Sequence, residues 1–458
     1  MTSPAFPSIV DTTELWLMFR TVASESFFAE LQPASGPGSR SGIFSIAMVI
    51  WLMLYQRLHS KGTLVAALQV MTRLGQSGHL RLAHPCKRIR EGNISANTGG
   101  YCQARQKLPM PVVKTVSNHI FDQLRQQLRD PSHSGPPVYV IDGTTLRLRH
   151  ERDLVEAFPP GHNQHGGNHW PVLLMVAFHD VYTGLAAQPS WGAMYGPKAV
   201  SEQSLAEQAL DRLPADAIVL ADGNFGIFAF VHAVQKSQRP ILARLTASRA
   251  RKILGNTTPS PGKRRKVTWL PSIYERRAHP DLPPEASVEG WVVVSQNPAR
   301  PTEMLYLFTT LDWTPARILE LYKLRWNIET DLRSLKRTIG LHQINGRAKA
   351  MVEKELLLAV SAYNLVRAVI AIAACREGLP ARQFSFSVSQ DAVMAAWSDL
   401  QQATTTDDYN REMELLLFFV SKAKLPKRSG SRSYPREIWG RGGHFPFRRS
   451  IPATESGQ

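Results

Sequence analysis

The sequence predicts an α/β fold in which a mixed β-sheet is flanked by helices. Three observations predict it. Residues 43–130 place apolar side chains at helical spacing, residues 138–245 contain several strand patterns, and a long amphipathic helix begins near residue 315. Strand, hairpin, helix, strand and helix in this order are typical of a mixed sheet with helices on both faces.

Length and charge set broad limits on what the chain is. Its 458 residues are enough for roughly two to four structural units. Lysines and arginines number 54 against 37 acidic residues, and the net charge of +17 favours a polyanionic partner such as nucleic acid. The cysteines Cys86, Cys102 and Cys375 lack CxxC spacing, which indicates a reducing compartment and argues against disulfides or a thiolate zinc site.

No membrane segment is expected. The N-terminus lacks a basic region followed by an apolar core, so a secretory signal is not expected. The apolar run at 43–55 is too short to cross a bilayer. A second run at 356–374 is interrupted by polar residues that include Asn364 and Arg367. Both runs predict buried helices.

The first 130 residues predict a helical region. A linker-like stretch rich in Pro, Gly and Ser at 33–42 precedes the helical patterns. Between two of these patterns, the segment YCQARQKLP carries Arg105 and Lys107. The region could contact DNA through these two cations, or it could simply pack on the core. The pattern leaves both options open.

Two aspartates lie in strand patterns of the predicted core. Asp142 is at the centre of a strand at 138–149, and Asp222 is at the exit of a short buried strand at 217–226 that enters a Gly-rich turn. The other expected core elements are a hairpin at 169–191 that turns at 180–184, a helix at 201–213 and a strand at 239–245.

Residues 246–300 differ in composition from the preceding segment and are rich in Pro, Arg and Lys. One clear strand pattern lies at 288–296, and a buried-strand pattern follows at 303–311. Thr314 and Pro315 then predict a helix N-cap and first helical residue. This segment also contains a basic cluster formed by Lys263, Arg264, Arg265 and Lys266. The cluster is predicted to be a DNA-contacting loop if the core is catalytic, and a solvated run of charges otherwise.

The helix that follows carries a second set of candidate residues. At about 100° per residue, Tyr322, Arg325, Glu329 and Lys336 fall within an arc of about 60°. The apolar stripe is centred about 85° further round and consists of Leu321, Leu324, Ile328, Leu332, Leu335 and Ile339. One face can therefore dock on a core while an adjacent edge presents a carboxylate between cations.

Together, Asp142, Asp222 and Glu329 predict a site for a hard divalent cation, with Mg²⁺ the usual choice. Each residue alone also has an ordinary explanation. Asp-Gly pairs are common turns, and a charged helix edge commonly holds surface salt bridges. However, both aspartates lie in apolar strand contexts, where a charge is costly without a partner.

The spacing Tyr-(2)-Arg-(3)-Glu-(6)-Lys resembles the YREK signature of the IS4-type DDE transposases. The segments IDGTT around Asp142 and ADGNF around Asp222 resemble those that carry the two catalytic aspartates of that family. SANTGGYCQARQKLP and AYNLVRA are similar to further family segments, and the resemblance covers roughly residues 40–375.

The resemblance implies an RNase H-like core with a mainly β insertion between the second aspartate and the glutamate. It implies that Asp142, Asp222 and Glu329 form a metal-binding triad for Mg²⁺, with Mn²⁺ possible. Tyr322, Arg325 and Lys336 would contact the DNA strand end. Some relatives cleave through a hairpin with a base flipped onto an aromatic, a role that Trp269 or Trp291 could take.

The resulting hypothesis is a bacterial DNA transposase that cleaves insertion-sequence ends and transfers their strands. It would act on double-stranded DNA, as a homodimer in a synaptic complex, in the cytoplasm at the nucleoid. Alternatives are an RNase H-like nuclease without strand transfer and a catalytically silent DNA-binding derivative. The expected divisions are a helical region at 1–130, a core in two parts at 136–245 and 303–378, an insertion at 246–302 and a basic C-terminal region at 379–458.

Overall fold

The computed structural model describes most of the chain, namely residues 27, 30–31, 43–59, 62–76, 87–91, 93–95, 97–128, 130, 133–163, 166–255, 258–297, 300–402 and 405–426. The predicted linker at 33–42 and the tail beyond residue 426 lie outside these residues.

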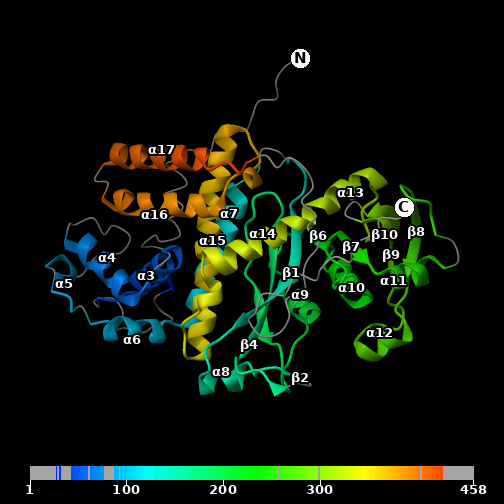
Figure 1. Cartoon of the computed structure of the whole chain (residues 1–458), viewed down its shortest axis with the longest axis horizontal. Helices are drawn as coiled ribbons and strands as arrows, with labels where there is room; N and C mark the ends of the chain where they lie inside the picture. Colours follow the sequence, from blue (N-terminus) through cyan, green and yellow to red (C-terminus); the bar gives the residue numbers. More distant parts are fainter. Residues whose placement is uncertain are drawn as a thin grey trace, which may run out of the picture.

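An eight-stranded mixed sheet forms the centre of the molecule (Figure 1). Its order is β5-β4-β1-β6-β7-β10-β9-β8. β1 is antiparallel to β4 and parallel to β6, which is parallel to β7. The predicted mixed α/β fold, a sheet flanked by helices, is confirmed. The strands are β1 (Val138–Arg147), β4 (Val172–Asp180), β5 (Ser190–Ala193), β6 (Ile218–Ala221), β7 (Ile241–Leu245), β8 (Arg264–Trp269), β9 (Val288–Asn297) and β10 (Arg300–Thr309); a separate short pair comprises β2 (His162–Asn163) and β3 (Gly166–Gly167).

The central strands are buried along most of their length. All four residues of β6 are buried, as are Val138, Tyr139, Val140 and Ile141 at the start of β1. Such near-continuous apolar runs are typical of parallel strands covered by helices on both sides. The predicted hairpin at 169–191 is present as β4 and β5, and its turn is closed by Asp180, whose carboxylate accepts from the backbone N–H groups of Tyr182 and Thr183.

One long helix, α15 (Lys349–Glu377), runs through the middle of the molecule (Figure 1). It is the one helix among the described residues that is long and apolar enough to cross a membrane, but its most apolar stretch is entirely buried inside the protein. Helices from both ends of the chain pack on it. They are α3 (Ile46–Leu58), α6 (Gly99–Lys107) and α7 (Met110–Gln127) from the N-terminal part, and α16 (Phe386–Gln402) and α17 (Thr406–Lys422) from the C-terminal part.

Smaller helices complete the layers around this frame. The predicted helix at 201–213 is present as α9 (Glu202–Leu210), which packs against β4. The others are α4 (Leu64–Gln76), α5 (Lys87–Arg90), α8 (Arg152–Ala157), α10 (Phe228–Lys236), and the 3-10 turns η4 (Leu341–Gln343) and η5 (Ala381–Gln383).

The segment predicted as an insertion extends the central sheet. It contains α11 (Ala247–Leu254) and α12 (Ile273–Ala278) beside β8 and β9, and β9 pairs with β10 of the core. The prediction of a single clear strand here was incomplete. The basic cluster Lys263–Lys266 was expected to be a loop, but three of its four residues begin strand β8. The proposed division at residues 246 and 302 stays a prediction.

The long helix predicted from Pro315 is segmented. Thr314 caps it as predicted, accepting from the backbone N–H of Arg317. The expected regular α-helix is wrong in its second half, because the run contains three different helical geometries. These are α13 (Pro315–Lys323), the 3-10 turn η2 (Leu324–Trp326), α14 (Asn327–Arg333) and the π-helical turn η3 (Ser334–Thr338).

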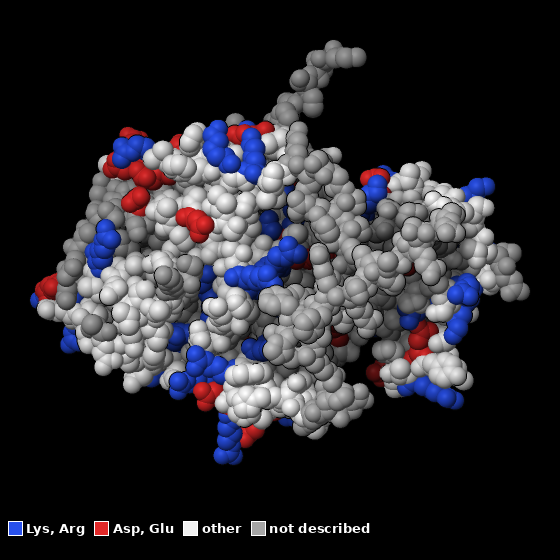
Figure 2. Space-filling model, viewed as in Figure 1, with Lys and Arg blue, Asp and Glu red and all other residues white. Residues whose placement is uncertain are grey.

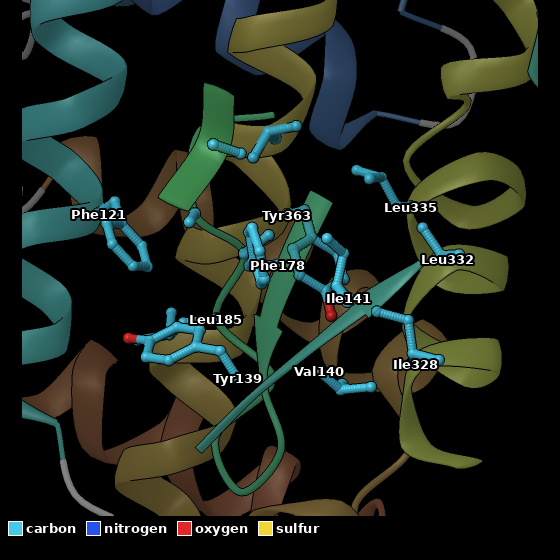
Figure 3. Close-up of a cluster of buried hydrophobic side chains, with 14 of the residues drawn as sticks. Phe121, Tyr139, Val140, Ile141, Phe178, Leu185, Ile328, Leu332, Leu335 and Tyr363 are labelled. Carbon is cyan, nitrogen blue, oxygen red and sulfur yellow. The ribbon is translucent and has the colours of Figure 1, made fainter. Parts of the chain in front are cut away.

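The apolar stripe of this run docks on the sheet as predicted. Figure 3 shows Ile328, Leu332 and Leu335 facing Val140 and Ile141 of β1. Ile328 and Leu335 are fully buried. Burial of such side chains is worth about 1.5–3 kcal/mol each, so this contact fixes α14 against the strand that carries Asp142.

Candidate active site

Asp142 lies within β1, and Asp222 directly follows β6, the neighbouring strand. Val140 of β1 pairs in parallel register with Leu220 of β6, and each aspartate lies two residues further along its strand direction. Adjacent strands are about 4.8 Å apart, so the two residues are close neighbours. Each carboxylate is held by a local backbone N–H. Asp142 Oδ1 accepts from Gly143 at 2.8 Å, and Asp222 Oδ1 accepts from Asn224 at 2.9 Å.

A third carboxylate, that of Glu202, lies beside this pair. Glu202 is the first residue of α9, after the capping residue Ser201. A Cβ placed on Gly143 would lie 2.4 Å from Glu202 Oε1, so this carboxylate would have to shift if residue 143 carried a side chain. Sequence reasoning missed Glu202, because an acidic residue in the first turn of a helix is ordinary and carries no further signal.

The charges of these acids act on one another. Burial raises the pKa of Asp142 to about 6, and the negative charges of Asp222 and Glu202 act in the same direction. The Gly143 hydrogen bond and the positive charge of Arg325 oppose this rise. Burial and the charge of Asp222 also raise the pKa of Glu202. The cluster therefore holds more negative charge than its surroundings neutralise.

Arg325 links the aspartates to the glutamate of the helical run. Its side chain is only 12% exposed, and its Nη2 lies 3.9 Å from Glu329 Oε1. Its charge also reaches Asp142 and the buried phenol of Tyr322. Burial raises the pKa of Tyr322, against the charges of Arg325 and Arg244. Of the predicted site, Asp142, Asp222, Tyr322 and Arg325 are therefore brought together, with Glu329 next to Arg325.

The donor set suits a hard divalent cation. Carboxylate oxygens are the ligands that Mg²⁺ and Mn²⁺ prefer, and a cation would offset both the burial and the neighbouring negative charges that raise the pKa of Asp142. Among the residues that the structure describes, no three acidic, histidine or cysteine side chains are already gathered into a metal cage. Glu329 is 40% exposed on the side chain and paired to Arg325 only at 3.9 Å, so it has room to move.

Lys336 reaches back to the strand that carries Asp142. Its Nζ donates to Thr144 Oγ1 and to the carbonyl oxygen of Thr145, both at 3.0 Å. Burial and the neighbouring charges of Arg147 and Arg337 lower the pKa of Lys336. Lys336 lies in the π-helical turn, a geometry that is often found at functional sites. The ammonium group is thus held against the strand that carries Asp142.

A buried ionic cluster holds α14 from the opposite side. Asp331 is fully buried and bonds to Arg367 of α15 at 2.5 Å and to Arg382. Arg382 also donates to the carbonyl oxygens of Asp180 and Val181 in the β4 turn. Burial would raise the pKa of Asp331, but the two guanidinium charges outweigh burial and lower it. The helical face of Asp331 points inward while Glu329, about 200° away, points outward.

The aromatic residues of the site differ from those expected. Trp269 is 3% exposed and packs against Phe308, and the ring of Trp291 is covered by Arg264 at 3.9 Å. Trp269 is therefore closed to a base, and an arginine lies over the ring of Trp291. Trp326 is 53% exposed and on the same helical run as Glu329, with the Arg325 guanidinium over its ring at 4.5 Å.

The remaining predicted DNA contacts lie apart from this site. Arg105 is 12% exposed and forms an ion pair with Glu355, whereas Lys107 is exposed at the end of α6. The cluster Lys263–Lys266 is on β8, five strands from β1, or about 24 Å across the sheet. Within that cluster, Arg264 bonds to Asp312 and Lys266 lies 3.5 Å from Glu289.

Comparison with known families identifies the chain. The family model for the transposase DDE domain matches residues 133–365, slightly more than half of the 458 residues. The chain belongs to this family. The matched segment begins just before β1 and ends within α15, so it contains both aspartates and the helical run with Glu329.

The DDE transposase also resembles individual relatives. It is 26% identical over 363 residues to "Transposase InsG for insertion sequence element IS4" of Escherichia coli (strain K12), which covers 75% of this chain and 77% of that protein. A solved piggyBac transposase synaptic complex with hairpin DNA aligns at a TM-score of 0.43 and 10% identity over 94% of this chain and 88% of that chain, a likeness too low to bear on the argument. The predicted IS4-type resemblance and the predicted function as a DNA transposase are confirmed.

Proposed function

We propose that this transposase binds divalent cations, Mg²⁺ or Mn²⁺, through Asp142, Asp222 and Glu329, and cuts and joins the ends of an insertion sequence. The proposal is supported by the parallel register of β1 and β6, which places Asp142 and Asp222 side by side. The positive charge of Arg325 acts on Asp142, and the same guanidinium pairs with Glu329. When bound, such cations would activate the attacking oxygen and stabilise the leaving oxygen of a phosphodiester.

The side chains around the carboxylates would position the DNA strand end. Arg325 has a guanidinium suited to paired hydrogen bonds with a phosphate, and Lys336 offers a point charge held against β1. Tyr322, buried beside Arg325, would hold that guanidinium in place and present its hydroxyl to the same phosphate. Trp326 is the exposed ring nearest these groups and would stack on an unpaired base.

The proposed reaction has two stages. Hydrolysis at each end frees a 3′-hydroxyl, and that hydroxyl then attacks target DNA, so the same carboxylates would serve both stages. Two ends must be brought together for this, and we propose a homodimer on DNA, in the cytoplasm of a bacterium and at the nucleoid.

The direct test is cleavage of a supercoiled plasmid that carries the DNA flanking the gene, in the presence of Mg²⁺. We expect wild type to nick and excise, and the Glu329→Gln variant to bind the same DNA without cutting it. Glu320→Gln, on the exposed part of α13, is the matched control and should cut like wild type. Equal cleavage by wild type and Glu329→Gln would overturn the proposed chemistry.

Strand transfer is tested separately with pre-cleaved ends. Joining of these ends to a target plasmid supports the transposition reaction as proposed. Cutting of intact ends without any joining of pre-cleaved ends would instead identify a nuclease of the same fold.

A further inference from the structure

A cavity of about 770 Å³ lies where the N-terminal helices meet the end of the catalytic helical run. Its walls come from six places in the chain: α3, the segment 59–64, α6, Arg149 after β1, the segment 337–348 and the start of α15. It lies next to the candidate active site along the chain, because Arg337 in its wall directly follows Lys336. The cavity is not part of the metal site, since none of the predicted triad lines it.

The floor of this cavity carries more buried positive than negative charge. Glu355, which is 3% exposed, accepts from Arg57 at 2.5 Å and from Arg105. The backbone N–H of Asn345 also donates to Glu355. Two cations, Arg57 and Arg105, thus share a single acid in a place where unbalanced charge is costly.

One donor of this floor has no partner. The Nε of Arg105 is buried and makes no hydrogen bond, although its Nη2 bonds to Glu355. Buried guanidinium N–H groups are normally satisfied, so this one is an exception. A bound anion would supply the missing negative charge.

The rim adds three more guanidinium groups, those of Arg149, Arg337 and Arg347, all of them exposed. Arg149 bonds to Asn345 at 3.0 Å, which leaves its charge uncompensated. Arg347 is 75% exposed and lies 3.5 Å from Glu151. Figure 2 shows Lys and Arg side chains gathered in the lower middle of this face, where Figure 1 places the end of α6 beside the start of α15.

Among the described residues that line the cavity, Glu355 is the only acid. An arginine-rich recess of this size suits phosphate, because the planar guanidinium pairs with two oxygens of one phosphate. Its volume lies within the range of about 300–1,000 Å³ found for small-ligand pockets, enough for a nucleotide unit. The chain is a DNA transposase, so the abundant phosphate in its surroundings is that of DNA.

We propose that this cavity binds backbone phosphates of DNA that runs from the active site across Arg337 towards the N-terminal helices. Arg149, Arg337 and Arg347 would contact the phosphates directly, and the floor would add the positive charge of Arg57 and Arg105. The inference rests on the proposed function only in taking DNA as the ligand. It makes the junction between the N-terminal helices and the core part of the DNA-binding surface, away from the metal ligands.

The test measures DNA binding without cleavage, by fluorescence anisotropy of a mixed-sequence duplex in the Asp142→Asn background. A triple variant with Arg149, Arg337 and Arg347 each replaced by Gln is compared with a control that loses equal charge elsewhere. The control replaces Arg376, Arg411 and Lys422 with Gln, near the far end of α15 and on α17. Affinity is followed between about 50 and 200 mM salt, where each lost phosphate contact lowers the slope of log K against log salt by about 0.9.

We expect the rim variant to lose at least about tenfold in affinity and about two to three units of salt slope, and the control to lose far less. Equal losses in the two variants would overturn the proposal. If the triple variant folds poorly, the single exposed substitution Arg347→Gln is measured in the same way. We expect it to lose about one unit of the slope of log K against log salt.

Free anions are the competing source of the same chemistry. Pyrophosphate could raise the melting temperature of wild type but not of the rim variant, while the two proteins bind DNA with equal affinity. That result would assign the cavity to a free anion and overturn the DNA proposal. Because anisotropy needs no catalysis, a failure of plasmid cleavage leaves this result readable on its own.

Discussion

Asp331 and Arg367 form a fully buried ion pair of 2.5 Å that joins the helix of Glu329 to α15. Asp331 is two residues from Glu329 but lies on the inward face, where Arg382 also binds it and ties it to the β4 turn. The candidate metal ligand is therefore carried by a helix whose other side is fixed to the longest buried helix of the protein. This anchoring gives Glu329 a defined starting position while its own side chain stays half-exposed.

Removing this anchor should unfold the protein more easily. Asp331→Ala would leave Arg367 and Arg382 buried without their partner, and loss of one member of a buried pair costs about 3–5 kcal/mol. Glu414→Ala is the control, because Glu414 forms an exposed two-bond pair with Arg376 that is worth at most about 1 kcal/mol. Urea unfolding measures both. Equal losses of the free energy of unfolding would show that the Asp331 cluster is not an anchor.

Asp142 should make the metal-free protein less stable as pH rises. Its folded pKa of about 6 lies above the ordinary value of 3.8, so folding favours its protonated form. The stability that this form contributes is present at low pH and is lost as pH rises from about 4 through about 6. We expect the melting temperature of wild type to fall relative to Asp142→Asn over that range. Parallel melting curves for the two proteins would contradict the raised pKa.

Glu202 should matter for metal binding although it lies outside the predicted triad. Its carboxylate adds negative charge beside Asp142 and Asp222, so Glu202→Gln should weaken binding of Mg²⁺ about tenfold, as loss of a supporting group around a metal site does. Calorimetric titration with Mg²⁺ measures this. Glu207→Gln, on the same helix and also partly buried, should bind as wild type does. Equal effects of the two substitutions would remove Glu202 from the site.

Lys336 should act on cleavage more than on folding. Lys336→Met removes an ammonium group held against the strand of Asp142, and loss of one charge-stabilising group costs about 10²–10³ in rate. Lys323→Met removes an exposed cation of the same run, paired with Glu320, and should leave the rate unchanged. Single-turnover nicking measures both. A rate for Lys336→Met within about twofold of wild type would show that the group only tethers the helix to β1.

The parts of the site that rest on local pattern were predictable from the sequence. Asp142 and Asp222 lie in apolar strand segments, and Thr314 with Pro315 marks a helix start by local chemistry alone. The strand register that brings the two aspartates level follows from the parallel pairing of β1 and β6, which the alternation of strands and helices indicates.

The rest depends on contacts between distant residues. Glu202 reaches Asp142 because Gly143 leaves room for it, and no spacing rule encodes that approach. Strand β8 was hidden because three cations precede its two buried positions, Val267 and Trp269. The helical run contains a 3-10 turn and a π-helical turn, so a regular period of 3.6 residues misplaces Lys336.

The central claim is that Asp142, Asp222 and Glu329 share a metal site, and metal-directed backbone cleavage tests it most directly. Fe²⁺ in place of Mg²⁺, with ascorbate and peroxide, generates hydroxyl radicals that cut the chain next to the bound ion. We predict cuts beside all three residues, suppressed by excess Mg²⁺ and abolished at every position by Glu329→Gln. Cuts beside Asp142 and Asp222 alone, unchanged in Glu329→Gln, would contradict the account.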